Sequence, residues 1–377
     1  MERIYLDYNA TTPVDPEVVE AMHPYYHDIW GNKASGNWYG KQEKKDVEED
    51  STKRDSRRGW GPEEKAVTSG GSEANNLAIK GLAWANREKG DHIITSSIEH
   101  PAVINPCHYL EELGFRVTYL PVDEYGMVDP EHVEDAIDDE TILISIMHAN
   151  NEVGTIQPIA AIGNIANEHG VLFHTDAAQS VGKIPTRVEV LNIDMLSVAS
   201  HKFYGPKGMG ALYIRKGINL KPLIHGAGHE GGRRAGTENT AGIAGLGKAC
   251  ELAERELVDR IQGLTELRDG FLQMLKEQVG TLIVNGHQTE RLPNTLSVSF
   301  PRRNASKLLE SVPEVCASTG SACHQGLETS SPVLEAMGIG REQGLGAVRF
   351  SIGRWTTRPE LVEAAKLIGK SIMTKSA

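Results

Sequence analysis

The chain is organised around one short polar segment, Ser200-His201-Lys202-Phe203-Tyr204-Gly205-Pro206-Lys207-Gly208. This segment directly follows the apolar run 194–199, which is predicted to be a strand, and it closes in a glycine-proline turn. Lys202 is therefore expected where a strand stops and a pocket can begin. A desolvated lysine amine has a lowered proton affinity and can form a Schiff base with a carbonyl. The alternative is an ordinary surface lysine in a loop.

Length and composition indicate a globular protein of ordinary type. The chain has 377 residues, of which 39% are hydrophobic and 24% are charged. This size favours one large and one small domain, and we expect an arm over residues 1–14, a large domain over 15–258 and a small domain over 259–377. No apolar run reaches the roughly 18 residues that span a bilayer. No signal segment follows Met1, so we expect a cytoplasmic protein without membrane contact.

The charge and the cysteines argue against several classes of protein. A net charge of −12 disfavours nonspecific binding to nucleic acid. The cysteines are widely spaced and form no Cys-x-x-Cys pair, which indicates a reducing compartment, no disulfide framework and no metal site. They are Cys107, Cys250, Cys316 and Cys323.

Polar groups recur where predicted strands end. Apolar runs near residues 92–95, 141–147, 171–174 and 194–199 alternate with helical patterns, which predicts an α/β fold with a mostly parallel sheet. Shorter strands and helices after about residue 280 predict a smaller α+β domain. Ligand crevices in open α/β sheets form at the carboxyl ends of the strands, so we expect the polar groups there to form one site.

A small-residue turn is predicted to bind an anion. Gly71 and Ser72 open an apolar helical pattern that ends near Gly90. Their backbone N–H groups, the Ser72 hydroxyl and the positive end of the helix dipole could face a phosphate. The alternative is a glycine-rich helix cap without a ligand.

The expected site combines an imidazole, a carboxylate, two amides and an amine. These groups belong to His100, Asp176, Asn151, Gln179 and Lys202. Pyridoxal phosphate needs a lysine for its aldehyde, an acid for its ring nitrogen and an anion site for its phosphate. Considered alone, the histidine could be structural and the aspartate could cap a helix.

Several motifs, in the same order over nearly the whole chain, resemble those of the cysteine desulfurases of the class V aminotransferase family. The motifs are Asp7-Tyr8-Asn9-Ala10-Thr11-Thr12, Thr68-Ser69-Gly70-Gly71-Ser72-Glu73-Ala74-Asn75-Asn76, Ala149-Asn150-Asn151-Glu152-Val153-Gly154, His174-Thr175-Asp176-Ala177-Ala178-Gln179-Ser180, Ser200-His201-Lys202, Arg234-Ala235-Gly236-Thr237-Glu238-Asn239 and Gly320-Ser321-Ala322-Cys323. The resemblance implies a homodimeric fold-type I pyridoxal-phosphate transferase with a mostly parallel, seven-stranded sheet in its large domain.

The resemblance also implies roles for individual residues. Lys202 would bind the cofactor aldehyde, Asp176 the ring nitrogen and Gln179 the ring hydroxyl, while His100 would stack on the ring and move protons with Lys202. Asn151 would contact the cofactor and the substrate. The phosphate would be held by Gly71, Ser72, Ser200 and His201, with Thr237 contributed by the partner subunit.

Cys323 is the candidate nucleophile. It lies in a loop of small residues, which leaves a thiol accessible, and a thiolate can attack the sulfur of a substrate activated by the cofactor. The alternative is an inert buried cysteine. The resemblance implies conversion of L-cysteine to L-alanine with a persulfide on Cys323, which passes sulfur to an acceptor or iron–sulfur scaffold protein for cluster assembly or other thiolation. The resemblance also implies that Arg349 binds the substrate carboxylate, with which a guanidinium can form two parallel hydrogen bonds.

Some segments depart from the family pattern. The family has Gly-Asn-Pro-Ser-Ser and then a histidine where this chain has residues 31–40, and residues 47–60 lack an apolar helical face. We expect a solvated helix or loop over residues 41–65. We also expect a helix from about Thr240 through the 270s with a break near Gly263.

Three other functions stay open, one of which is an aminotransferase that uses no nucleophilic thiol. His324, directly after the candidate cysteine, resembles the pattern of selenocysteine lyases. A catalytically quiet dimer that serves as a scaffold for partner proteins is the alternative outside enzymology.

Overall fold

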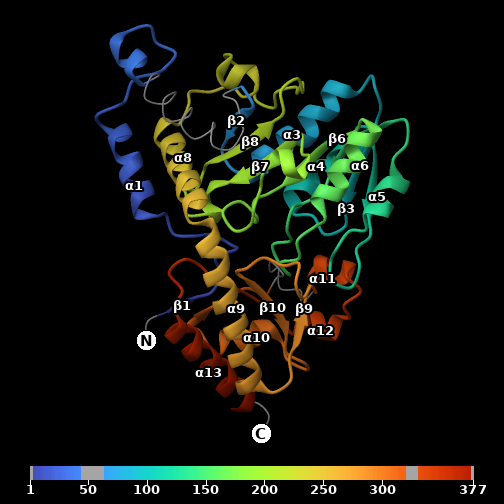
Figure 1. Ribbon diagram of the computed structural model, residues 1–377, viewed down its shortest axis with the longest axis vertical. Helices are drawn as coiled ribbons and strands as arrows, with labels where there is room; N and C mark the ends of the chain where they lie inside the picture. The colour runs from blue at the N-terminus through green and yellow to red at the C-terminus, as the bar shows by residue number, and fades with distance from the viewer. Residues whose placement is uncertain (1–2, 44–62, 320–329, 375–377) are drawn as a thin grey trace.

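A seven-stranded sheet forms the centre of the larger, upper lobe of the molecule (Figure 1). The structure is a computed structural model that describes residues 3–43, 63–319 and 330–374. The strand order is β2-β8-β7-β6-β5-β3-β4, and β8 alone runs antiparallel to its neighbours. The strands are β2 Lys65–Thr68, β3 His92–Ser96, β4 Arg116–Leu120, β5 Thr141–Ser145, β6 Leu172–Asp176, β7 Met195–Ala199 and β8 Gly210–Ile214.

Helices cover both faces of this sheet because its central strands are apolar on both sides. Alternate residues point to opposite faces, so Leu143 of β5 belongs to one hydrophobic cluster and Ile144 to the other. One face is covered by α3 Gly71–Asn86 and α4 Pro101–Glu112. The other face is covered by α1 Pro16–Met22, α5 Pro130–Ala136, α6 Ile159–His169, α7 Val188–Leu191 and α8 Thr240–Arg255.

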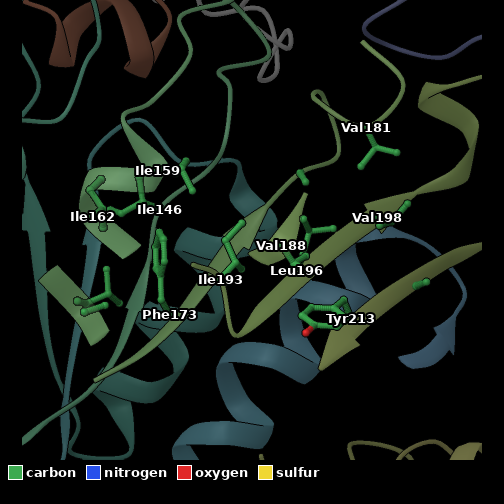
Figure 2. Packing of buried hydrophobic residues seen from close by; sticks show 14 of the residues in the cluster. Ile146, Ile159, Ile162, Phe173, Val181, Val188, Ile193, Leu196, Val198 and Tyr213 are labelled. Carbon is green, nitrogen blue, oxygen red and sulfur yellow. The ribbon is translucent and has the colours of Figure 1, made fainter. Parts of the chain in front are cut away.

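The hydrophobic cluster under α1, α5, α6, α7 and α8 is the larger of the two. Figure 2 shows Phe173, Leu196 and Val198 of the sheet among side chains of the covering helices, such as Ile159 and Ile162. Phe173 and Leu196 are fully buried. This packing fixes the positions at which β6 and β7 end, and with them the polar residues that follow.

The smaller, lower lobe is built on an antiparallel sheet of order β12-β10-β9 (Figure 1). Its core includes an edge-to-face contact between Phe271 and Phe350, with ring centroids 5.2 Å apart. Its elements are α9 Leu257–Val279, β9 Ile283–Asn285, β10 Thr295–Ser299, α10 Ala305–Glu310, β11 Val315–Cys316, α11 Pro332–Ala336, α12 Arg341–Leu345, β12 Ala347–Ser351 and α13 Arg358–Thr374. The short helices η1 His23–Tyr26, η2 Ser200–Lys202 and η3 His229–Gly232 lie outside this lobe. The predicted boundary at residues 258 and 259 falls in the first turn of α9 and stays a prediction.

The N-terminal segment crosses from one lobe to the other. It starts as β1 Ile4–Tyr5, which pairs in parallel with β11 of the small lobe. Further along, the Thr12 N–H donates to the His201 carbonyl at 2.9 Å, and the Asp15 N–H donates to the Tyr204 carbonyl at 2.9 Å. Residues 7–12 are thereby held beside the turn that carries Lys202.

The helix break expected near Gly263 was wrong. The chain bends at Glu256, between α8 and α9, and Gly263 lies inside α9. A single glycine costs a helix only about 1 kcal/mol, and α9 continues through Gly263 where it packs along α13. Glu256 lies at the bend with φ −109° and ψ 5°, and its carboxylate binds Arg255, Arg260 and Arg354.

Two segments singled out from the sequence cannot be compared with the structure. The loop expected at residues 41–65 lies mostly outside the residues that the structure describes, as does Cys323. Within the described residues, no helix combines the length and the apolar character needed to cross a bilayer.

Candidate active site

The carboxyl ends of the central strands open into a pocket of about 370 Å³. The strands end there because each apolar run is followed by polar or small residues. The predicted residues that line it are Gly71, Ser72, His100, Asn151, Asp176, Gln179, His201, Lys202 and Arg349. The remaining lining residues are Asn9, Ala10, Asn75, Ala102, Met147, Ala149, Ala178 and Ala199. The structure thus brings together side chains from the arm, the large lobe and the small lobe.

Lys202 ends the short helix η2 that follows β7. Its Nζ donates to the Asn9 carbonyl at 2.6 Å and to the Ala10 carbonyl at 2.9 Å. Both acceptors belong to the arm, so the amine is held by backbone groups rather than by a carboxylate.

The environment of Lys202 raises the share of neutral amine. Burial is the main reason that the pKa of Lys202 is lowered to about 8; the Arg349 cation acts in the same direction, and the carboxylates of Asp176 and Asp7 oppose it. A primary amine must be neutral to attack a carbonyl, so this shift makes Lys202 a nucleophile near neutral pH.

Asp176 is a buried carboxylate held in one orientation. Its Oδ2 accepts a hydrogen bond from Asn75 Nδ2 at 2.6 Å, and its Oδ1 accepts from the Ala178 N–H at 2.9 Å. Asn75 lies one turn after Ser72 on α3, so this helix contributes to the pocket twice. Among the described residues, Asn75 Oδ1 is buried without a hydrogen-bond partner.

The start of α3 has the features of an anion cradle. Its N-cap is Gly70, which supplies no side chain to the first N–H groups. A Cβ on Gly71 would lie 3.2 Å from the Ala199 Cβ, so the turn packs closely against the end of β7. In the described part of the chain the buried Ser200 hydroxyl has no partner. Gly71 and Ser72 at this helix start line the pocket together with Lys202, and their open N–H groups fit the phosphate of the expected cofactor.

His100 caps the helix on the neighbouring side of the pocket. Its Nδ1 accepts a hydrogen bond from the Ala102 N–H at 3.0 Å, so the proton of the neutral ring is assigned to Nε2. Burial and the Lys202 cation lower the pKa of His100, against the opposing effect of Asp176. The imidazole is therefore neutral near pH 7 and can accept a proton only after its helix-capping hydrogen bond changes.

Arg349 enters the pocket from β12 of the small lobe. Its guanidinium donates to Asp7 Oδ1 at 2.7 Å and to the Asn151 carbonyl at 2.9 Å. Its Nε is buried and, within the described residues, has no acceptor. The Arg349 backbone also pairs with Ser318, two residues before the range 320–329.

Two predicted residues do not line this pocket. Ser200 is buried, with its hydroxyl on the Gly205 side, and Thr237 lines a separate pocket of about 190 Å³ with Glu230 and Arg234. Thr237 was expected to act from a partner subunit, so its place in one chain leaves that expectation untested. The expected nucleophile Cys323 lies outside the described residues.

The sequence analysis assigned no role to three residues that organise the site. Asn75 and Asn9 belong to motifs that had been recognised, so their position in those motifs was an available signal. Lys183 had no such signal, because it follows a glycine in an irregular turn.

Comparison with known proteins places the chain in a family. The sequence model of the Aminotransferase class-V family matches residues 4–363. A protein of Dictyoglomus turgidum named "Cysteine desulfurase IscS" is 49% identical over 95% of this chain and 91% of its own length. A protein of the same name from Methanosarcina thermophila is 49% identical over 97% of this chain and 91% of its own length.

Solved structures agree with these relatives. A chain titled "NIFS-LIKE PROTEIN" superposes with a TM-score of 0.92 and 38% identity, covering 99% of this chain and 100% of that one. A chain titled "SspA in complex with cysteine" has a TM-score of 0.82 and 40% identity, covering 94% and 100%. The predicted fold class, a fold-type I transferase with a mostly parallel seven-stranded sheet, is confirmed. The chain belongs to the class V aminotransferase family, as one of its cysteine desulfurases.

Proposed function

We propose that this chain binds pyridoxal phosphate at Lys202 and converts L-cysteine to L-alanine, leaving a persulfide on Cys323. The observation that carries the proposal is the Lys202 amine, whose pKa is lowered to about 8 in a pocket that also contains Asp176 and Arg349. A nucleophilic amine, a fixed carboxylate and a guanidinium at one sheet edge suit the chemistry of an amino acid on this cofactor.

The described residues fit the cofactor. Lys202 would hold its aldehyde, Asp176 its ring nitrogen and Gln179 its ring hydroxyl, with His100 against the ring. The phosphate would lie at the start of α3, with Gly71, Ser72, Ser200 and His201 around it. When bound, the cofactor would supply an electron sink that withdraws electrons from the amino acid.

Arg349 and Asn151 would select the amino acid. The guanidinium already reaches into the pocket and retains a buried Nε that has no acceptor among the described residues. A substrate carboxylate would accept hydrogen bonds from it and compete with Asp7 for its charge. Lys202 and the Nε2 side of His100 would then hold and move the protons of the amino group and its carbon.

The sulfur step is a displacement at the substrate sulfur. The Cys323 thiolate would attack that sulfur, the Cβ–S bond would break and an S–S bond would form. The electron pair of the broken bond would remain with the carbon fragment, which takes up a proton to become the methyl group of alanine. The sulfur is left on the enzyme as a persulfide.

The proposal includes partners and a compartment. A second copy of the chain would contribute Thr237 to the phosphate, and a sulfur acceptor or iron–sulfur scaffold protein would take the persulfide sulfur. Support comes from relatives named "Cysteine desulfurase IscS" and from a neighbour solved in complex with cysteine. We propose a cytoplasmic location for these reactions.

A product assay with matched cysteine variants tests this function. The wild-type holoenzyme should release alanine from L-cysteine and retain a persulfide, whereas Cys323→Ser should keep the cofactor colour and form neither product. Cys250→Ser, on α8, is the control and should behave as wild type. Equal alanine formation by Cys323→Ser would contradict the proposed nucleophile.

The same assay separates the second candidate function. His324 beside the candidate cysteine favours testing L-selenocysteine at the same concentrations. A selenocysteine lyase would release alanine from L-selenocysteine and little from L-cysteine. Absence of product from both, with colour retained, would favour a scaffold role.

A further inference from the structure

Lys183 is a buried lysine for which the proposed chemistry has no role. Its side chain is only 6% exposed. Among the described residues it forms no ion pair with a carboxylate, and its Nζ donates instead to two amide oxygens, Gln179 Oε1 at 2.7 Å and Asn9 Oδ1 at 3.4 Å. Burying an amine without a counterion is costly, and these two hydrogen bonds offset part of that cost.

The first contact determines which way the Gln179 amide faces. Because Oε1 accepts from Lys183, the NH2 group is on the opposite side, where Nε2 donates to the Asn9 carbonyl at 3.0 Å. With Lys183 protonated, a flipped amide would set two donors against each other at the lysine, and in either charge state it would set the Gln179 oxygen against the Asn9 carbonyl. Gln179 lines the pocket, so Lys183 ensures that the pocket meets an N–H donor rather than an oxygen.

The second contact is with Asn9, which also binds Lys202. The Asn9 carbonyl accepts from both Gln179 and Lys202, while its Oδ1 accepts from Lys183 and, at 3.0 Å, from Asn294. Asn9 Nδ2 donates to Thr295 Oγ1 at 2.8 Å, which anchors the residue to the small lobe. Lys183 and Lys202 are therefore joined through a single asparagine.

Burial and two nearby cations favour the neutral form of the Lys183 amine. Burial lowers the pKa of Lys183 well below its usual value, and the cations of Lys202 and Arg349 act in the same direction. A lysine amine donates hydrogen bonds whether or not it is protonated, so both contacts can persist when it is neutral.

We propose that Lys183 is a positioning residue that holds the Gln179 amide with its NH2 group toward the pocket and holds Asn9 under Lys202. This inference rests on the proposed function, since the group that Gln179 would meet is the ring hydroxyl of pyridoxal phosphate. Lys183 itself touches neither the cofactor nor the substrate in this role.

A cofactor titration of the apoprotein tests the inference. Lys183→Met keeps the apolar stem and removes the donor, and it should weaken the affinity for pyridoxal phosphate about tenfold, the scale of one lost hydrogen bond. Gln179→Ala should weaken it comparably. The double variant should be no weaker than Gln179→Ala alone, because Lys183 acts through the amide. Lys207→Met, an exposed lysine nearby, is the control and should match wild type.

The outcomes separate a positioning role from a structural one. Additive losses in the double variant would overturn the inference, and so would wild-type affinity in Lys183→Met. If Lys183→Met does not fold, Gln179→Glu gives the answer: it keeps an oxygen for Lys183 but loses the N–H that faces the pocket and the Asn9 carbonyl, so affinity should fall. Unchanged affinity of Gln179→Glu would contradict the assigned orientation.

Failure of the inference is distinct from failure of the proposed function. A wild-type apoprotein that binds no pyridoxal phosphate would refute the function itself. A wild-type protein that binds it, with Lys183→Met and Gln179→Glu both binding equally well, would refute the role of Lys183 alone.

Discussion

The two edges of the large sheet carry pockets of similar size but different character. At the carboxyl edge lies the candidate active site, of about 370 Å³. At the amino edge, where β5 and β6 begin, lies a pocket of about 420 Å³ whose lining includes Lys89, Asp138, Asp139 and His169. Pocket volume alone would place the active site at the amino edge.

The difference lies in how the charged groups are paired and solvated. At the amino edge Arg116 binds Asp138 at 2.9 Å and Asp91 at 3.1 Å on an open surface, and the Arg116 guanidinium lowers the pKa of Asp138 to about 2. At the carboxyl edge Lys202 and Arg349 are desolvated and crowd one another, which lowers the pKa of Lys202 to about 8. Buried and incompletely paired groups, rather than cavity volume, mark the reactive edge.

Removing the amine of the carboxyl edge should have the largest effect. We expect Lys202→Ala to lower the rate of alanine formation about a thousandfold or more, because the cofactor loses its covalent attachment and the reaction loses a proton carrier. Steady-state kinetics with added pyridoxal phosphate measures this. Retention of more than a tenth of the wild-type rate would place the chemistry elsewhere.

Glu99, which lies at the carboxyl edge, should make the free energy of unfolding of the protein depend on pH. Burial raises the pKa of Glu99 to about 8, although its carboxyl accepts hydrogen bonds from Ser96 and the Met147 N–H. The folded protein therefore retains a proton that the unfolded chain releases near pH 4.5, and this contribution to stability is lost as the pH rises through 8.

Glu99→Gln should remove that dependence. Relative to wild type, the variant should gain on the order of a few kcal/mol in free energy of unfolding between pH 5 and pH 9. Urea unfolding of both proteins at the two pH values measures the difference. Parallel stability curves would show that Glu99 is ionised in the folded protein.

Arg349→Lys tests recognition of the amino acid separately from cofactor binding. Loss of the two-point contact should raise KM for L-cysteine roughly thirtyfold, about 2 kcal/mol, while the affinity of the apoprotein for pyridoxal phosphate stays within about twofold. Kinetics and cofactor titration measure the two quantities. A large loss of cofactor affinity with an unchanged KM would reverse the assigned roles.

Asp138→Asn at the amino edge should have the smallest effect. Surface ion pairs contribute about 0.5 kcal/mol, so we expect a small loss of stability and unchanged activity. Thermal melting and the alanine assay check this. A strong loss of activity would mean that the amino edge also serves the reaction and would remove the contrast between the two edges.

The reactive edge could be predicted from the sequence because its parts lie directly after apolar runs. Asp176 ends β6 and Lys202 lies in the short helix that follows β7; both strands are identifiable by their composition, and Gly71 starts a helix with a clear apolar face. The parallel sheet then brings these ends together without further information.

Other features depend on contacts between distant parts of the chain. Asn9 meets Lys202 only because β1 pairs with β11 and carries the arm across both lobes. The role proposed for Lys183 depends on the orientation of the Gln179 amide, which a sequence pattern does not show. The bend lies at Glu256, whose carboxylate pairs with Arg354 from far along the chain, and the glycine at 263 was a false signal for it.

The most direct test of the account is the site of cofactor attachment. The holoprotein, reconstituted with pyridoxal phosphate, is reduced with borohydride and mapped by peptide mass spectrometry. The account predicts one phosphopyridoxyl group, on Lys202. Attachment to Lys183 or to a lysine of the amino edge such as Lys89, or no attachment at all, would contradict it.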